Sequence, residues 1–115
     1  MTINRLGRAM ALKKEQISNK TQGLCKLVID QELTIYTIET LKQGLSEEID
    51  LYDKFELNLA SVEEIDSAGI QLLLALRDEL VSRKKTFILT ALSSAVTELI
   101  DLYAVSDRLN IGDAA

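Results

Sequence analysis

A serine that follows an aspartate and precedes a small residue and a glycine is the part of this chain best suited to chemistry. The segment Ile65-Asp66-Ser67-Ala68-Gly69-Ile70-Gln71 lies between an alternating, strand-like run and a long leucine-rich run. This change of hydrophobic period predicts that a strand ends and a helix begins here. Because a helix N-terminus offers unpaired N–H groups and the positive end of its dipole, it tolerates a phosphate or another oxyanion. Ser67 is therefore the candidate to carry one.

The neighbours of Ser67 have two interpretations. In the functional one, Asp66 caps the helix while Ala68 and Gly69 keep the approach to Ser67 open. In the structural one, Asp66 and Ser67 only cap a helix, and Gly69 only lets that helix pack closely.

The composition excludes most kinds of enzyme chemistry. The 115 residues include no histidine, tryptophan or proline and a single cysteine, so one chain cannot build a Ser-His-Asp triad, a His-containing zinc site or a disulfide. The five glycines are scattered and form no phosphate-binding loop. We therefore expect a protein that is not an enzyme and has no cofactor and no metal site. ATP, magnesium and a general base would come from a partner kinase.

Charge is divided unevenly along the chain. The net charge of −5 consists of +4 over residues 1–20 and −9 over the remainder. An acidic domain argues against nucleic acid as a partner. The longest apolar run, Leu72 to Leu76, is too short for a membrane span. We expect a basic tail at 1–11, one domain at 12–115 and a cytoplasmic location without membrane insertion.

Hydrophobic periodicity predicts the elements that position Ser67. On residues 24–30, Cys25, Leu27 and Ile29 share one face, which indicates a core thiol. The nearly continuous apolarity of 87–92 predicts a central strand. The expected elements are a hairpin of 12–18 and 24–30, helix 36–49, strand 55–60, a helix from near 66 to about 81, strand 87–92, a helix capped by Ser93-Ser94, and a short strand at 109–111. The fold class is α/β, a mixed four- to five-stranded sheet with helices mainly on one face.

In this order and context, the chain resembles the STAS domain of bacterial anti-sigma-factor antagonists over about 12–111. The strand Phe55 to Ala60 and the segment Ile65-Asp66-Ser67-Ala68-Gly69-Ile70 resemble the family's strand and its Asp-Ser-small-Gly-apolar signature. The strand at 86–94 and the following residues 95–100 resemble the family's next strand and helix. Where the family often has Gly-Glu-Leu-Asp after its second strand, this chain reads Gln31-Glu32-Leu33-Thr34.

The resemblance implies a phosphorylation-controlled binding protein. Ser67 would be the phosphoacceptor of an anti-sigma factor with serine-kinase activity, and a phosphatase would oppose that kinase. The unphosphorylated form would bind the anti-sigma factor and free the sigma factor. The resemblance implies a partner-binding surface of Thr34, Asp66, Ser67, Ala68, Gly69 and Gln71, altered at Thr34 relative to the family.

Another function remains open, in which the chain is a STAS adaptor subunit of a lipid-transport ATPase or of a chemotaxis-associated complex. Ser67 would then pack or contact a partner without being phosphorylated. An acidic receiver or a small phosphatase fits poorly, because Asp30 and Asp66 do not supply the acidic cluster that such chemistry needs.

Overall fold

After two initial strands, the elements of the chain alternate between helices and strands. The computed structural model describes residues 12–14, 23–109 and 111. The elements are β1 (Leu12–Lys14), β2 (Leu24–Ile29), α1 (Ile38–Ile49), β3 (Lys54–Leu59), α2 (Ser67–Ser82), β4 (Thr86–Leu92), α3 (Ser94–Leu102) and a 3₁₀ turn, η1 (Ser106–Arg108). The proposed tail at 1–11 lies outside the described residues.

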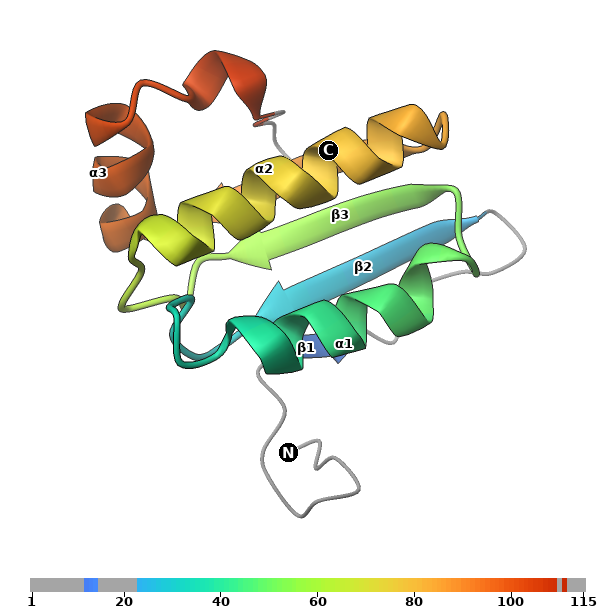
Figure 1. Cartoon of the computed structure of the whole chain (residues 1–115), viewed down its shortest axis with the longest axis horizontal. Helices are drawn as coiled ribbons and strands as arrows, with labels where there is room; N and C mark the ends of the chain where they lie inside the picture. The colour runs from blue at the N-terminus through green and yellow to red at the C-terminus, as the bar shows by residue number, and fades with distance from the viewer. Residues whose placement is uncertain (1–11, 15–22, 110, 112–115) are drawn as a thin grey trace.

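The sheet has the order β1-β2-β3-β4. Strands β2, β3 and β4 are parallel, because α1 and α2 form the crossovers between them. Strand β1 pairs antiparallel with β2, which confirms the start of the predicted hairpin; residues 15–18 lie outside the described part. Helices α1 and α2 lie side by side over the same face of the sheet, and α3 lies at the end toward which the arrows of β2 and β3 point (Figure 1). The domain is therefore α/β, with a parallel three-stranded centre.

Alternation along the strands separates the core from the opposite sheet face. The side chains of Cys25, Leu57 and Leu89 are buried on the helix-covered face, and Cys25 is the core thiol that the sequence predicted. On the other face the side chains are half-buried, and Lys26 of β2 forms an ion pair with Glu56 of β3 at 3.5 Å. A half-covered face allows polar residues between the core positions, which explains the alternating pattern of β2 and β3.

One prediction near the end of the sheet was wrong, and a second is described only in part. Strand β4 is not central, since in the described sheet it pairs with β3 alone, and beyond it lies only an isolated bridge between Leu89 and Ile111. Of the expected strand at 109–111 the structure describes only residues 109 and 111, and Ile111 forms the isolated parallel bridge to Leu89. The apolarity of β4 reflects full cover on the face of Phe87 and Leu89 and partial cover on the opposite face, where Ile88 is half-buried.

The predicted helices 36–49 and 66–81 both form, with one shifted start. Helix α1 begins at Ile38, and Tyr36 lies in the preceding turn with its side chain 88% exposed. Helix α3 begins as predicted, with the Ser93 hydroxyl accepting a hydrogen bond from the N–H of Val96 at 3.2 Å. Within the described residues, no helix combines the length and apolar character needed to cross a bilayer.

Side chains after α2 hold the far end of the domain together. The half-buried Lys85 donates hydrogen bonds from Nζ to the carbonyls of Ile49 and Tyr52, at 2.5 and 2.8 Å. The exposed Arg83 bridges Glu79 and Asp50, and hydrogen bonds to Glu79 and then Asp50 raise the pKa of its guanidinium. Lys85 therefore ties the C-terminal end of α1 to the start of β4.

Candidate functional site

The site forms where the loop after β2 meets the loop after β3, at the carboxyl edge of the parallel strands. Leu33 and Ile65 form an isolated parallel bridge between the two loops. The N–H of Leu33 donates to the carbonyl of Glu64 at 2.8 Å, and the N–H of Asp66 donates to the carbonyl of Leu33 at 3.3 Å. These backbone bonds fix the position from which α2 starts.

Asp66 joins the two loops to the helix through both oxygens of its carboxylate. Its Oδ1 accepts from the N–H of Gly69 at 3.1 Å, which caps α2 as the sequence predicted. Its Oδ2 accepts from the N–H of Ile35 in the other loop at 3.0 Å. Asp66 is therefore both an N-cap and a clamp on the loop that contains Thr34.

Gly69 is buried where α2 passes closest to the loop after β2. A Cβ at this position would lie 2.2 Å from the carbonyl oxygen of Leu33, and 2.9 Å from carbons of the Leu33 and Ile65 side chains. The missing side chain therefore permits a close approach of two backbone segments. This corrects the expectation that Gly69 keeps the approach to Ser67 open, and it supports the packing interpretation for this residue.

Ser67 is exposed at the first position of α2. It lines a small pocket of about 200 Å³ together with Ile70, Gln71, Leu74, Tyr103 and Val105. The pocket brings Ser67 and Gln71 of α2 next to the segment that follows α3. An incoming protein can reach both residues, since Gln71 is exposed as well.

Thr34 organises the loop from the inside. It is 6% exposed, and its hydroxyl donates to Oε2 of Glu32 at 2.9 Å while accepting from the N–H of Tyr36 at 3.3 Å. The hydroxyl of Thr37 accepts from the N–H of Thr34 and donates to the carbonyl of Glu32. Thr34, which departs from the family pattern, therefore holds the carboxylate of Glu32.

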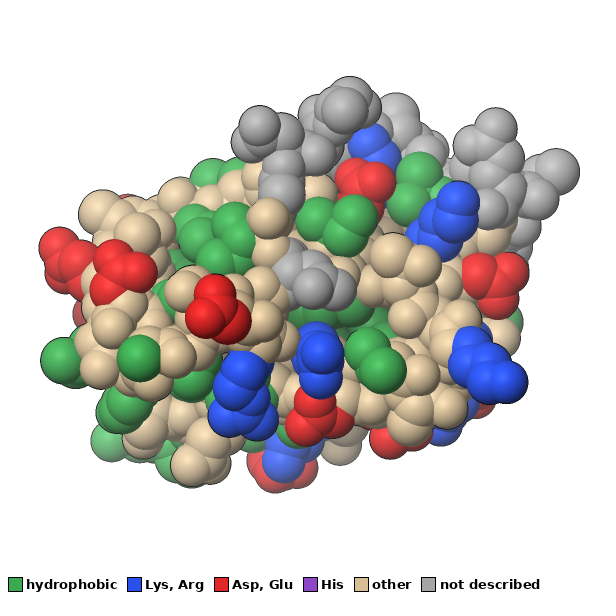
Figure 2. Space-filling model, turned by 90° about the horizontal axis from the view of Figure 1, so that it is seen from above, with side chains coloured by type: hydrophobic (Ala, Val, Ile, Leu, Met, Phe, Trp, Pro, Cys, Tyr) green, Lys and Arg blue, Asp and Glu red, His purple; other side chains and the backbone are tan. Residues whose placement is uncertain are grey.

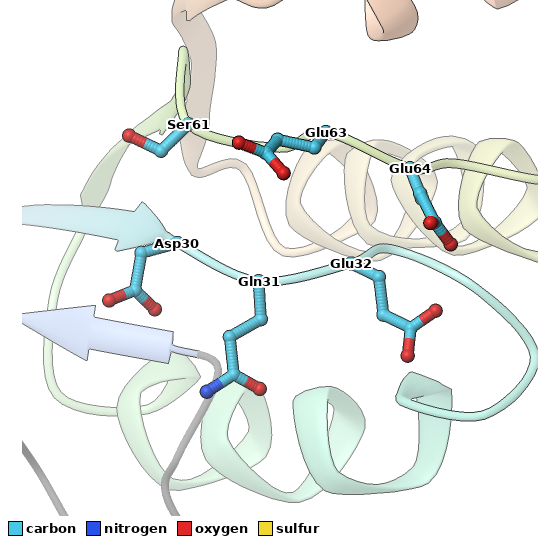
Figure 3. A pocket seen from close by; sticks show the side chains of 6 residues that line it. All are labelled: Asp30, Gln31, Glu32, Ser61, Glu63 and Glu64. Carbon is cyan, nitrogen blue, oxygen red and sulfur yellow. The ribbon is translucent and has the colours of Figure 1, made fainter.

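Acidic side chains surround the edge at which the motif lies. A cavity of about 560 Å³ is lined by Asp30, Gln31 and Glu32 from the loop after β2 and by Ser61, Glu63 and Glu64 from the loop after β3 (Figure 3). In Figure 3 the carboxylate of Glu63 is turned into the space beside Ser61, while that of Glu32 points away from it. Among the described residues these groups do not form a cluster that could hold a metal ion.

A groove beside this cavity contains residues that the sequence analysis did not select. Its volume is about 620 Å³, and its lining includes Tyr36 of the first loop and Leu102 of α3. These two side chains are 88% and 74% exposed. Acidic and hydrophobic side chains gather at the left of Figure 2, the end where α3 lies in Figure 1. The adjacent apolar pair Ile35-Tyr36, outside the periodic part of helix 38–49, was the available signal.

The structure brings the predicted site residues to one edge but gives them different accessibility. Ser67 and Gln71 are exposed, and Asp66 is half-buried. Ala68 packs against the core. With Thr34 and Gly69 buried, these interior residues can affect a partner only through the groups that they position.

Comparison with protein families gives one match that spans most of the chain. The family model described as Mlab, STAS domain, matches residues 18–111. No curated protein sequence gives a significant match.

Solved structures with the same fold include three related to anti-sigma factor antagonists. A putative antagonist from Thermotoga maritima is 21% identical, with a TM-score of 0.77 over 90% of this chain and 86% of that one. The antagonist SpoIIAA in its unphosphorylated form is 20% identical, with a TM-score of 0.71 over 91% and 89%. The phosphorylated form of SpoIIAA from Bacillus is 19% identical, with a TM-score of 0.68 over 91% and 92%.

Proposed function

The chain belongs to the STAS family, and on that premise we propose that it is an anti-sigma-factor antagonist controlled by phosphorylation of Ser67. The unphosphorylated form binds an anti-sigma factor that has serine-kinase activity, and a phosphatase reverses the modification. The proposal places the chain in the cytoplasm, where sigma factors act. The exposed hydroxyl of Ser67 at the start of α2, beside an acidic edge, is the observation that carries it.

The geometry favours Ser67 as a modified residue over a catalytic one. Its position at the first turn of α2 presents the hydroxyl to the active site of another protein. The two hydrogen bonds accepted by the Asp66 carboxylate hold that position in the unmodified protein. Phosphorylation then changes the charge of the surface while leaving the fold intact.

Electrostatics gives the sign and size of the switch. A phosphoserine adds about −1.5 to −2 charges to an edge that already contains Glu63, Glu64 and Asp66. An unpaired charge buried at an interface costs about 2–5 kcal/mol, which is roughly 30-fold to several-thousand-fold in affinity. The dipole of α2 returns only about 0.3–1 kcal/mol. Phosphorylation is therefore expected to release the partner.

The test is calorimetric titration of the cognate anti-sigma factor with wild-type protein, the phosphorylated protein, Ser67→Ala and Ser67→Asp. Ser67→Ala should bind within about threefold of wild type, whereas phosphorylation and Ser67→Asp should weaken binding by about 30-fold or more. Ser82→Asp is the matched control, because it adds the same charge to an exposed serine at the other end of α2. If Ser67→Asp binds as tightly as Ser82→Asp, the switch is wrong.

A second candidate function is a constitutive STAS subunit of a larger assembly, such as a lipid-transport ATPase or a chemotaxis-associated complex. The matched family model is described as "Mlab, STAS domain". Because that description names no sigma-factor system, it favours keeping this second function. In this case Ser67 carries no phosphate in the native cell. Mass spectrometry of the native protein distinguishes the two functions, since a phosphate on Ser67 supports only the first.

A further inference from the structure

The groove beside the motif combines apolar walls with an acidic rim. Its apolar lining includes Tyr36 of the first loop, and Leu102 and the half-buried Leu99 of α3. The carboxylates that share the lining are Glu32, Glu63, Glu64, Asp66 and Glu98. The described lining contains neither lysine nor arginine. An apolar ligand alone would leave the negative charges of these carboxylates without a counter-charge. We therefore expect a ligand that carries positive charge.

One carboxylate of the rim is held in place before any ligand arrives. Oε2 of Glu32 accepts a hydrogen bond from the hydroxyl of Thr34, and the backbone carbonyl of Glu32 accepts a hydrogen bond from the hydroxyl of Thr37 at 2.9 Å. Since the backbone N–H of Tyr36 donates to the same Thr34 hydroxyl, one buried residue holds both the Glu32 carboxylate and the backbone at Tyr36. A side chain fixed in this way loses little rotamer entropy when it pairs with a cation.

We propose that this groove binds a cationic, amphipathic segment of the protein partner, in which an apolar side chain inserts between Tyr36 and Leu102 while an adjacent Lys or Arg pairs with Glu32. We choose a cationic segment as the occupant because acidic groups line the described rim, so the two charges would be complementary. Tyrosine is enriched among the residues that dominate binding energy at protein interfaces. Thr34 is a positioning residue, which acts through Glu32 and Tyr36.

The inference rests on the proposed function only in that a protein partner docks at this edge, and it adds that partner's chemistry. It also predicts a division of labour on the surface. The groove supplies standing affinity through an apolar contact and a fixed charge pair, while a phosphate on Ser67, which lines the neighbouring small pocket and not the groove, opposes binding at that pocket. Groove variants and Ser67→Asp should therefore weaken binding independently.

The first experiment titrates the cognate anti-sigma factor with groove variants of the full chain. Tyr36→Ala and Leu102→Ala should each lower affinity by about tenfold or more, while Leu51→Ala, an exposed leucine outside the groove, should stay within about twofold. Glu32→Gln should lower affinity by about fivefold to tenfold and reduce its dependence on salt between about 50 and 300 mM.

The positioning role of Thr34 has its own readout. Thr34→Val keeps the shape but removes the hydroxyl that holds the Glu32 carboxylate, so it should show part of the affinity loss and part of the reduced salt dependence of Glu32→Gln. Thr34→Ser should restore wild-type binding. In the Glu32→Gln background, Thr34→Val should change the salt dependence no further. If it still does, Thr34 does not act through Glu32.

A second experiment needs no natural partner. A short helical peptide of repeated Leu-Lys-Lys-Leu units is titrated into the isotopically labelled full chain and followed by amide chemical shifts. Shifts should concentrate at 32–36, 63–66 and 95–102, weaken in Tyr36→Ala, and vanish for a Leu-Glu-Glu-Leu control peptide.

The outcomes separate the groove from the switch. Groove variants that bind both probes like wild type overturn the inference, while an effect of Ser67→Asp on the anti-sigma factor leaves the switch intact. If only the groove variants weaken binding, the switch fails and the inference stands. Peptide-induced shifts outside the groove overturn it as well. So does tighter peptide binding after Arg5→Gln with Arg8→Gln, because the groove would then be occupied by the chain's own basic residues.

Discussion

Replacing Gly69 by alanine tests whether the close approach of α2 and the loop after β2 is required. The added Cβ would lie 2.2 Å from the carbonyl oxygen of Leu33, whereas ordinary contact begins at 3.4 Å, so the two backbones must separate by about 1.2 Å. The obstructing atom is a backbone oxygen, which no rotamer change can move away. Leu33 also forms the hydrogen bonds to Glu64 and Asp66, so the separation strains both bonds.

The magnitude follows from two opposing effects. Overpacking of a buried site costs about 1–3 kcal/mol. Alanine in place of glycine raises helix propensity, which returns up to about 1 kcal/mol. We expect Gly69→Ala to lower the free energy of unfolding by about 1–2 kcal/mol, and Gly69→Ser, with its extra atom, to lower it at least as much.

Urea denaturation measures the effect directly. With an m-value of about 1–3 kcal/mol per molar urea, the midpoint should fall by about 0.3–2 M. The opposite substitution at an exposed position of the same helix, Ala75→Gly, is the control and should cost only the propensity difference, about 0.5–1 kcal/mol. A Gly69→Ala protein that is as stable as wild type, or more stable, would refute the close-approach reasoning, because propensity alone would then account for the result.

Two further predictions concern the ties between elements, and urea denaturation checks both. Asp66→Ala should destabilise by about 2 kcal/mol, because it removes the cap of α2 and the acceptor for the N–H of Ile35, whereas Asp66→Asn keeps the capping oxygen and should cost about 1 kcal/mol. Equal losses for both variants would show that the cap contributes nothing. Lys85→Met should cost about 1–3 kcal/mol, since it removes the ammonium group that donates to the carbonyls of Ile49 and Tyr52, while Lys84→Met, at an exposed position, should stay within about 0.5 kcal/mol. A similar loss in the two lysine variants would contradict that assignment.

Much of the fold could be predicted from local pattern. Helix α2 begins where the period changes, and Asp66 and Ser93 cap their helices as their residue types predict. The alternation of β2 and β3 identified the buried positions, including Cys25. Local sequence pattern did not predict the order of the strands, because that order depends on how distant segments pair in the sheet. Strand β4 is apolar enough to be central, yet it lies at the end of the described sheet order.

The sequence predicted where the candidate site lies, but only part of what each of its residues does. The motif residues come together at one edge, but burial separates Ser67 and Gln71, which a partner can touch, from Thr34 and Gly69, which it cannot. The groove was missed, because Tyr36 was assigned to a helix and lies in a turn.

The sequence by itself determined that a hydroxyl stands at the start of a helix in an acidic domain that lacks catalytic histidine and phosphate-binding loops. Those features follow from residue type and local period, which need no partner elsewhere in the chain. Only the tertiary structure decided that Gly69 serves a backbone contact with Leu33, that Asp66 clamps Ile35, and that Tyr36 and Leu102 face one groove. Each of these depends on segments distant in sequence, and their juxtaposition is set by how α2, α3 and the loops pack on the sheet.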